Sequence, residues 1–193
     1  MFEIWGTLNG RYTEKDKRLS EHFTRVLNHE EEKSILFVPP SLPLWQKKLE
    51  QEQTAVLTFK YFRYENSPYV TAQQLKSALQ DFLPFREKML VSLSPICTDY
   101  NLKSGTAIPL TINIAQFKAA VNCSCIYFDE GIGSSYFTYK SENTHLVWVE
   151  DTKAIAYKHN LIKAAGFKGI YWENPYALLE GGWESLTAIY KKA

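Results

Sequence analysis

Short apolar runs alternate with stretches of helical periodicity along most of the chain. Four runs rich in strand-forming residues occupy positions 34–40, 54–62, 88–95 and 167–172. The spacing of apolar side chains predicts helices at 20–33, 71–82, 152–165 and 183–190. Continuous apolar strands that alternate with helices are typical of a parallel sheet with crossover helices, so the pattern predicts an α/β fold.

The hydrophobic pattern changes between residues 96 and 149, where apolar and polar positions alternate in short segments. This alternation predicts a small β-rich insertion rather than another strand-helix unit. After it, Asp151 is expected to cap the next helix and Gly166 to end it, and capping accounts for the acidic pair Glu150-Asp151 without catalysis. Because no repeat or linker divides the chain, we predict a single domain, residues 1–193, with 96–149 as the insertion.

The composition is that of a globular protein with balanced charge. Of the 193 residues 45% are hydrophobic, and 22 Lys+Arg residues face 21 Asp+Glu residues, for a net charge of +1. Such a chain buries enough apolar surface to fold, whereas nucleic-acid binding needs a clustered excess of Lys and Arg. We therefore expect an uncharged small molecule or a sugar as the partner, and no nucleic acid.

The sequence indicates no membrane contact, metal site or cofactor. Its apolar runs are shorter than the ~20 residues of a membrane helix, and no signal peptide follows Met1, so a cytoplasmic location is the default expectation. Three cysteines are too few for a disulfide framework, and the four histidines are too scattered for a zinc site. No phosphate-binding glycine motif occurs, so we expect no cofactor and no metal.

Aromatic and polar side chains gather where the predicted parallel strands end. Trp5, Tyr61 and Trp172 offer flat apolar rings with polar edges, and Tyr64 and Glu173 lie close to two of them in the sequence. The carboxyl ends of parallel strands face the site in α/β folds, and such rings suit the apolar face of a sugar. The alternative is that these aromatic side chains belong to the core.

The end of the chain resembles a known family. The stretch from His145 to Trp183, HLVWVEDTKAIAYKHNLIKAAGFKGIYWENPYALLEGGW, is similar to the C-terminal end of glycoside hydrolase family 18 domains, in the chitinase-like and spore-cortex branch. That branch has a Val-Trp-Phe-Glu-Asp segment, a helix with a lysine, and a Gly-Ile strand that ends in Trp. Residues 136–139 (YFTY) resemble the aromatic strand before it.

The resemblance extends backwards over most of the chain and implies the second half of a (β/α)8 TIM-type barrel, about strands 4/5 to 8. The matching segments are 89–95 for the seventh strand, 55–61 for the sixth, 34–40 for the fifth, and Phe2-Glu3 for the end of the fourth. A half barrel leaves two strand edges and an apolar sheet face open. We therefore expect a homo-oligomer or a partner that supplies the missing barrel half.

The resemblance also implies a chemistry, the substrate-assisted, retaining hydrolysis of β-1,4-linked N-acetylglucosamine polymers such as chitin or peptidoglycan. Glu3 would be the catalytic acid, Tyr61 would stabilise the oxazolinium-like intermediate, and Trp172 would be the stacking platform for the N-acetyl sugar. Further substrate-binding residues would be Trp5, Tyr64 and Glu173.

Two positions depart from the family pattern. Met1 stands where the family has an aspartate that orients the substrate's acetamide, and Phe62 stands where it has an aspartate after the tyrosine. Both changes remove polar contacts to the sugar. The alternative to an enzyme is therefore a truncated, catalytically inactive sugar-binding or assembly module, and the sequence leaves the enzyme question open.

Overall fold

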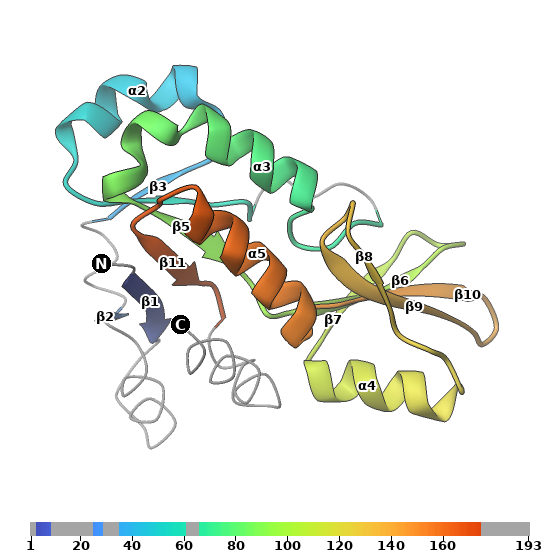
Figure 1. Cartoon of the computed structure of the whole chain (residues 1–193). Coiled ribbons are helices and arrows are strands. Elements are labelled where there is room, and N and C mark those ends of the chain that lie inside the picture. The colour runs from blue at the N-terminus through green and yellow to red at the C-terminus, as the bar shows by residue number, and fades with distance from the viewer. Residues whose placement is uncertain (1–2, 9–24, 29–34, 61–65, 175–193) are drawn as a thin grey trace. The chain divides into compact units, whose positions relative to one another are not determined.

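The computed structural model describes residues 3–8, 25–28, 35–60 and 66–174 (Figure 1). The chain divides into two compact units. Unit 1 comprises Met1–Phe62, Gln74–Ser94 and His159–Pro175, and unit 2 comprises Arg63–Gln73, Pro95–Lys158 and Tyr176–Ala193. The sequence predicted one domain with an insertion, and unit 2 contains that insertion.

Unit 1 is built on a parallel sheet, as the continuous apolar runs predicted. Its strands lie in the order β2 (Arg25–Asn28), β1 (Glu3–Leu8), β11 (Gly169–Trp172), β5 (Met89–Leu93), β4 (Ala55–Leu57) and β3 (Leu36–Val38), and every neighbouring pair is parallel (Figure 1). The four strands predicted from apolar runs, β3, β4, β5 and β11, are consecutive neighbours, as strands five to eight of a barrel would be. The α/β fold class is confirmed.

Helices connect these strands. They are α2 (Leu42–Gln51), α3 (Ala72–Asp81), the 3-10 helix η2 (Leu83–Lys88) and α5 (Thr152–Ala164). The predicted ends of α5 are confirmed, because the Asp151 carboxylate accepts a hydrogen bond from the Ala154 backbone N–H at 2.9 Å, and Gly166 follows with a left-handed φ of 75°. The expected helix at 183–190 lies outside the described residues.

The first strand is not where the sequence placed it. We expected Phe2-Glu3 to end a strand beside β3, but Glu3 begins β1, and β1 pairs with β11 near the opposite edge of the sheet. A Cβ atom at Gly169 would overlap the Glu3 carbonyl oxygen, so the missing side chain allows this pairing. The predicted helix at 20–33 is also wrong in its described part, which forms β2.

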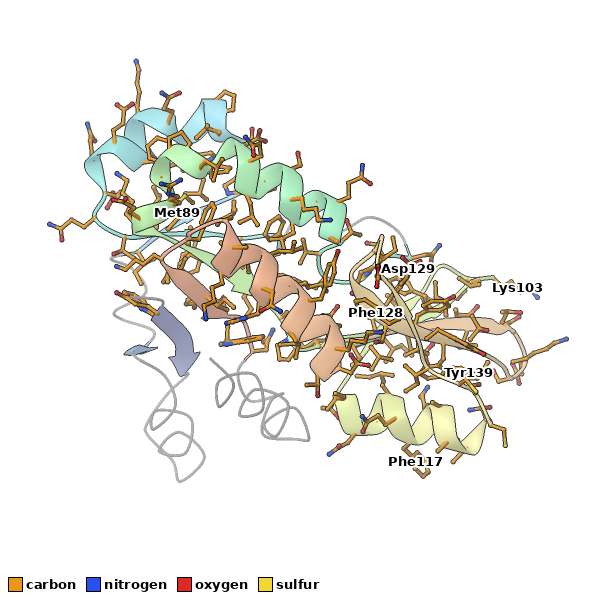
Figure 2. All side chains as sticks on the ribbon, viewed as in Figure 1. Met89, Lys103, Phe117, Phe128, Asp129 and Tyr139 are labelled. Carbon is orange, nitrogen blue, oxygen red and sulfur yellow. The ribbon has the colours of Figure 1, made fainter. Side chains whose placement is uncertain are left out.

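Unit 2 is an antiparallel sheet with one helix on it, which confirms the β-rich insertion. The strands lie in the order β7 (Ala107–Leu110), β6 (Cys97–Asn101), β10 (Thr144–Val149), β9 (Ser134–Lys140) and β8 (Tyr127–Asp129). Helix α4 (Ile112–Val121) buries Ile112, Ala115 and Ala119 against one sheet face, and Phe117 projects away from the sheet (Figure 2). No described helix of either unit is long and apolar enough to cross a membrane.

A buried ion pair lies at the start of α5 in unit 2. The Lys158 ammonium donates to both oxygens of the Glu150 carboxylate at 2.7 and 2.8 Å, and to the Ser134 hydroxyl at 2.9 Å. Ser134 in turn donates to Glu150 at 2.9 Å. All three ammonium protons of Lys158 thus have partners, which is what a charge needs away from water.

A second polar cluster fixes α4 to its sheet. Asp99 on β6 accepts hydrogen bonds from Lys118 at 2.7 Å and Tyr139 at 2.7 Å, and its other oxygen lies 2.8 Å from His145 Nδ1. Burial favours the neutral acid, but the hydrogen bonds from Lys118, Tyr139 and His145 outweigh it and hold the pKa of Asp99 below its ordinary value. Burial lowers the pKa of Lys118, but its hydrogen bonds to Asp99 and Tyr139 outweigh burial, so this pKa is raised above its ordinary value. The ionised Asp99 carboxylate therefore connects its own strand, β6, with β9, β10 and α4.

Candidate functional site

Polar side chains line one face of the parallel sheet near the carboxyl ends of its strands. The register pairs Leu57 with Val91 and Leu93 with Trp172, so the side chains of Thr58, Ser92, Ser94 and Glu173 emerge on the same face. This group, here named the carboxyl-edge cluster, lies entirely in unit 1. Parallel strands bring their carboxyl ends to one edge, where sites on such sheets form.

The carboxyl-edge cluster is held by hydrogen bonds that cross the sheet. The Thr58 hydroxyl donates to Glu173 Oε1 at 2.7 Å, although 115 positions separate the two residues. The Glu173 backbone N–H donates to the Leu93 carbonyl at 2.9 Å, and the Lys60 backbone N–H donates to the Thr58 hydroxyl at 3.3 Å. Glu173 therefore extends over β5 to reach the end of β4, and its carboxylate is oriented by this contact.

Ser94 is the member of the cluster without a partner. Its hydroxyl is buried, and no hydrogen bond to it forms among the described residues. A buried hydroxyl without a partner costs free energy, about 1–3 kcal/mol in proteins, and a ligand atom that accepts or donates there recovers part of it. Ser94 is therefore a point at the carboxyl edge where a polar ligand atom would recover free energy.

Apolar side chains underlie the cluster on the same face of the sheet. Trp5, Val56, Leu90 and Tyr171 form one buried group, and Phe37 packs edge-on against Tyr171 with ring centroids 5.3 Å apart. Trp5 was predicted to bind substrate, but it is buried in this layer. This agrees with the alternative prediction that the aromatic side chains belong to the core. The polar positions thus lie above a packed apolar floor that keeps them in place.

Trp172 does not offer the stacking surface that the resemblance implied. Alternation along β11 places it on the face opposite Tyr171, and its side chain is 0% exposed. Its indole N–H is buried without a hydrogen-bond partner among the described residues. A stacking platform needs an exposed ring face, so Trp172 acts here as core.

Glu3 lies at the amino end of the sheet. Its carboxylate accepts a hydrogen bond from the Trp5 indole at 2.7 Å and lies 3.7 Å from the Lys168 ammonium. Lys168 also donates to Thr54, which precedes β4, at 3.0 Å. These contacts tie three strand beginnings together. The expectation of a catalytic acid rested on Glu3 ending a strand, and that position is not found.

The other predicted residues divide into two groups. Glu173 lies at the carboxyl edge, as expected, whereas Tyr61 and Tyr64 lie outside the described residues. The sequence did not indicate Thr58, Ser92 or Ser94 as site residues. Their signal is the hydroxyl at alternate positions, as in Ser92-Leu93-Ser94 within an otherwise apolar strand.

The chemistry available to the cluster is hydrogen bonding by three hydroxyls and one carboxylate. Within the described ranges no three His, Cys, Asp or Glu residues are grouped so that they could hold a metal ion. A carboxylate beside hydroxyls suits a neutral ligand with several hydroxyl or amide groups, because each ligand group can donate or accept.

Solved structures of other proteins resemble this fold. The spore cortex-lytic enzyme SleL of Bacillus cereus matches with a TM-score of 0.67 and 20% sequence identity, over 84% of this chain and 41% of that enzyme. The class V chitinase of Nicotiana tobaccum matches with a TM-score of 0.60 and 12% identity, over 90% of this chain and 58% of the chitinase. The chain has the fold of part of a family 18 barrel.

The family 18 fold is therefore confirmed for this chain as a fold. The SleL of Bacillus megaterium also matches, with a TM-score of 0.63 and 19% identity, and the chain spans 39% of that enzyme's length. A variant of the tobacco chitinase was solved in complex with NAG4. No family model matches the sequence, and no curated protein sequence matches it either.

Proposed function

We propose that this chain binds β-1,4-linked N-acetylglucosamine polymers, such as chitin or peptidoglycan, at the carboxyl-edge cluster. The observation that carries the proposal is the carboxylate of Glu173, held by Thr58 on a family 18-like sheet, beside a Ser94 hydroxyl that has no hydrogen-bond partner among the described residues. The hydroxyl and acetamide groups of such a sugar are neutral donors and acceptors, which matches the chemistry of the cluster. A chitinase with this fold holds NAG4, which supports the ligand class.

Binding is favoured over hydrolysis by where the carboxylates lie. Substrate-assisted cleavage needs a protonated acid at the glycosidic oxygen, at the same edge as the sugar. In the described part of unit 1, Glu173 is at the carboxyl edge with its oxygen engaged by Thr58, whereas Glu3 is at the amino end. Hydrolysis stays the second candidate, carried by the shared fold with chitinases and cortex-lytic enzymes.

Calorimetric titration of the full chain with N-acetylglucosamine hexasaccharide tests the proposal. Thr58→Val removes the hydroxyl that holds Glu173, and Glu173→Ala removes the carboxylate. A hydrogen bond to a charged group contributes about 1.5–3 kcal/mol, so we expect Glu173→Ala to weaken binding by roughly 10–100-fold. Thr58→Val should weaken it less, since the carboxylate remains.

The matched control is Glu87→Gln, an exposed carboxylate change in the same unit. It should leave the affinity unchanged. Equal affinity of Glu173→Ala and the wild type would refute the assignment of the site. A fluorogenic substrate of the same sugar, with Glu3→Gln alongside, tests the second candidate, because turnover that disappears in Glu3→Gln would assign the acid to the amino end.

A further inference from the structure

Three aromatic side chains form a continuous row across unit 2. The register places Tyr127 of β8 opposite Tyr136 of β9, and Tyr136 opposite Trp148 of β10. Their ring centroids are 6.1 Å apart between Tyr127 and Tyr136, and 5.6 Å apart between Tyr136 and Trp148. The row, here named the aromatic ladder, therefore runs across the strands, with each ring in contact with the next.

The aromatic ladder lies on the sheet face opposite the core that packs under α4. The core lies on the other face of the sheet, where Phe137, Val147 and Val149 pack under α4. Side chains alternate between faces along a strand, so Tyr136 and Trp148 point away from that core. Burial accounts for Trp148 on this second face, whereas Tyr136 is half-buried and Tyr127 is exposed, so these two rings leave apolar surface open.

One end of the ladder is anchored and the other is exposed. The Trp148 indole N–H donates to the Asn66 carbonyl at 2.7 Å, and Trp148 is 8% exposed. Tyr136 is half-buried, and Tyr127 at the edge of the sheet is 59% exposed. Rings held by their neighbours lose little freedom when a ligand arrives, which lowers the entropic cost of binding.

The phenol groups of the ladder are available for hydrogen bonds. Neither Tyr127 nor Tyr136 has a hydrogen bond to its hydroxyl within the part of the chain that the structure describes. Two other tyrosines of the same sheet do, since Tyr139 donates to Asp99 at 2.7 Å and Tyr100 donates to the Ser67 carbonyl at 2.8 Å. The ladder therefore combines apolar ring faces with free polar tips.

The charges on these strands distinguish between kinds of ligand. A binding surface for single-stranded nucleic acid also uses stacked aromatic rings, but adds a positively charged groove along the phosphates. The three strands of the ladder contain one lysine, Lys140, and one aspartate, Asp129. A neutral ligand with an apolar face and equatorial hydroxyls fits this surface better.

We propose that the aromatic ladder is a second binding surface for a β-linked N-acetylglucosamine chain, separate from the carboxyl-edge cluster. Sugar rings stack on Tyr127 and Tyr136, and their hydroxyl or acetamide groups bond the two phenol oxygens. The choice of this sugar rests on the proposed function, whereas the stacking surface rests on the ladder alone.

The test measures the affinity of the full chain for hexasaccharides of N-acetylglucosamine, glucose and xylose, and for a single-stranded DNA hexamer. Tyr127→Ala removes the exposed ring, and Tyr136→Phe keeps the packing while it removes one hydroxyl. The matched control is Phe117→Ala, an aromatic residue of the same unit that is 66% exposed on α4. An aromatic contact contributes about 0.5–1.5 kcal/mol, so Tyr127→Ala should weaken binding roughly 2–10-fold while Phe117→Ala has no effect.

The outcomes separate this proposal from the proposed function. If N-acetylglucosamine hexasaccharide binds equally to the wild type and Tyr127→Ala, the ladder is not a binding surface, although the carboxyl-edge site can still hold. If a glucose or xylose chain binds instead and Tyr127→Ala weakens it, the stacking surface is supported and the choice of sugar is overturned. Binding of the DNA hexamer in place of every sugar would assign the ladder to nucleic acid and overturn the proposal.

Discussion

Replacing Lys158 with methionine tests whether the buried cluster at the start of α5 is held by charge. Methionine is similar in length but carries no charge, so Lys158→Met removes the ammonium and leaves Glu150 buried at 2% exposure. The Ser134 hydroxyl remains as its hydrogen-bond donor. One hydroxyl does not replace an ammonium that donates to both carboxylate oxygens.

The size of the loss follows from leaving one buried charge without its partner. Breaking a buried ion pair costs about 3–5 kcal/mol, because the remaining charge is uncompensated. The Ser134 hydroxyl still donates to Glu150 in the variant, so the loss should lie toward the lower end of that range. We therefore expect Lys158→Met to lose about 3–4 kcal/mol at pH 7.

Urea unfolding followed by tryptophan fluorescence at pH 7 measures the loss. The matched control is Lys163→Met, an exposed lysine on the same helix, which should change stability by less than about 0.5 kcal/mol. The double variant Glu150→Gln, Lys158→Met removes both charges and should recover most of the stability. A loss below about 1 kcal/mol at pH 7, or a double variant no more stable than Lys158→Met alone, would refute the argument from charge.

Three further predictions concern unit 2. Asp99→Asn should cost about 2 kcal/mol at pH 7, and because the pKa of Asp99 is lowered by folding, its contribution is present above about pH 4 and lost as the pH falls through the folded value. Unfolding at pH 3 and pH 7 checks this, and an equal loss at both would contradict it. Burial raises the pKa of Cys97 to about 12, so a maleimide at pH 7.5 should label the exposed Cys123 and Cys125 in the folded chain and reach Cys97 only after unfolding, as mass spectrometry would show. Gly133→Ala should cost about 1–3 kcal/mol by thermal melting, because φ is 74° and the new Cβ would lie 2.9 Å from that of Ala72; a melting point equal to that of the wild type would contradict the backbone geometry.

The sequence predicted those elements whose local pattern agrees with their final environment. Strands β4, β5 and β11 are buried on both faces, so they stand out as continuous apolar runs. Helix α5 carries its own boundary signals in Asp151 and Gly166. These features are local, and a single sequence displays them.

Other elements were missed because their signals conflict. The prolines at 39, 40 and 43 argue against a helix at this point of the sequence, so α2 was not predicted. Pro43 nevertheless falls in the first turn of α2, where a helix accepts proline. Helix α4 has apolar side chains on its exposed face as well as its buried one, among them Ile114, Phe117 and Val121, and this blurs the helical periodicity.

The candidate site was predicted only in part, because it depends on register between distant segments. Glu173 was found from its place after a strand. Its partner Thr58 is 115 positions away, and nothing local to either residue indicates the contact. The position of Glu3 failed for the same reason, since β1 pairs with the distant strand β11, and the absent side chain of Gly169 only permits this close pairing.

The pairing of β1 with β11 also determines when the parallel sheet is complete during synthesis. β1 is made early and its neighbour β11 late, with all of β3 to β10 between them. At about 5–20 residues per second, the ribosome leaves that edge of β1 unpaired for roughly 8–30 s. Over the same period the antiparallel strands of unit 2 emerge together and pair locally. The insertion can therefore fold on the nascent chain before the sheet that it interrupts, and β1 is the segment on which a chaperone would have most time to act.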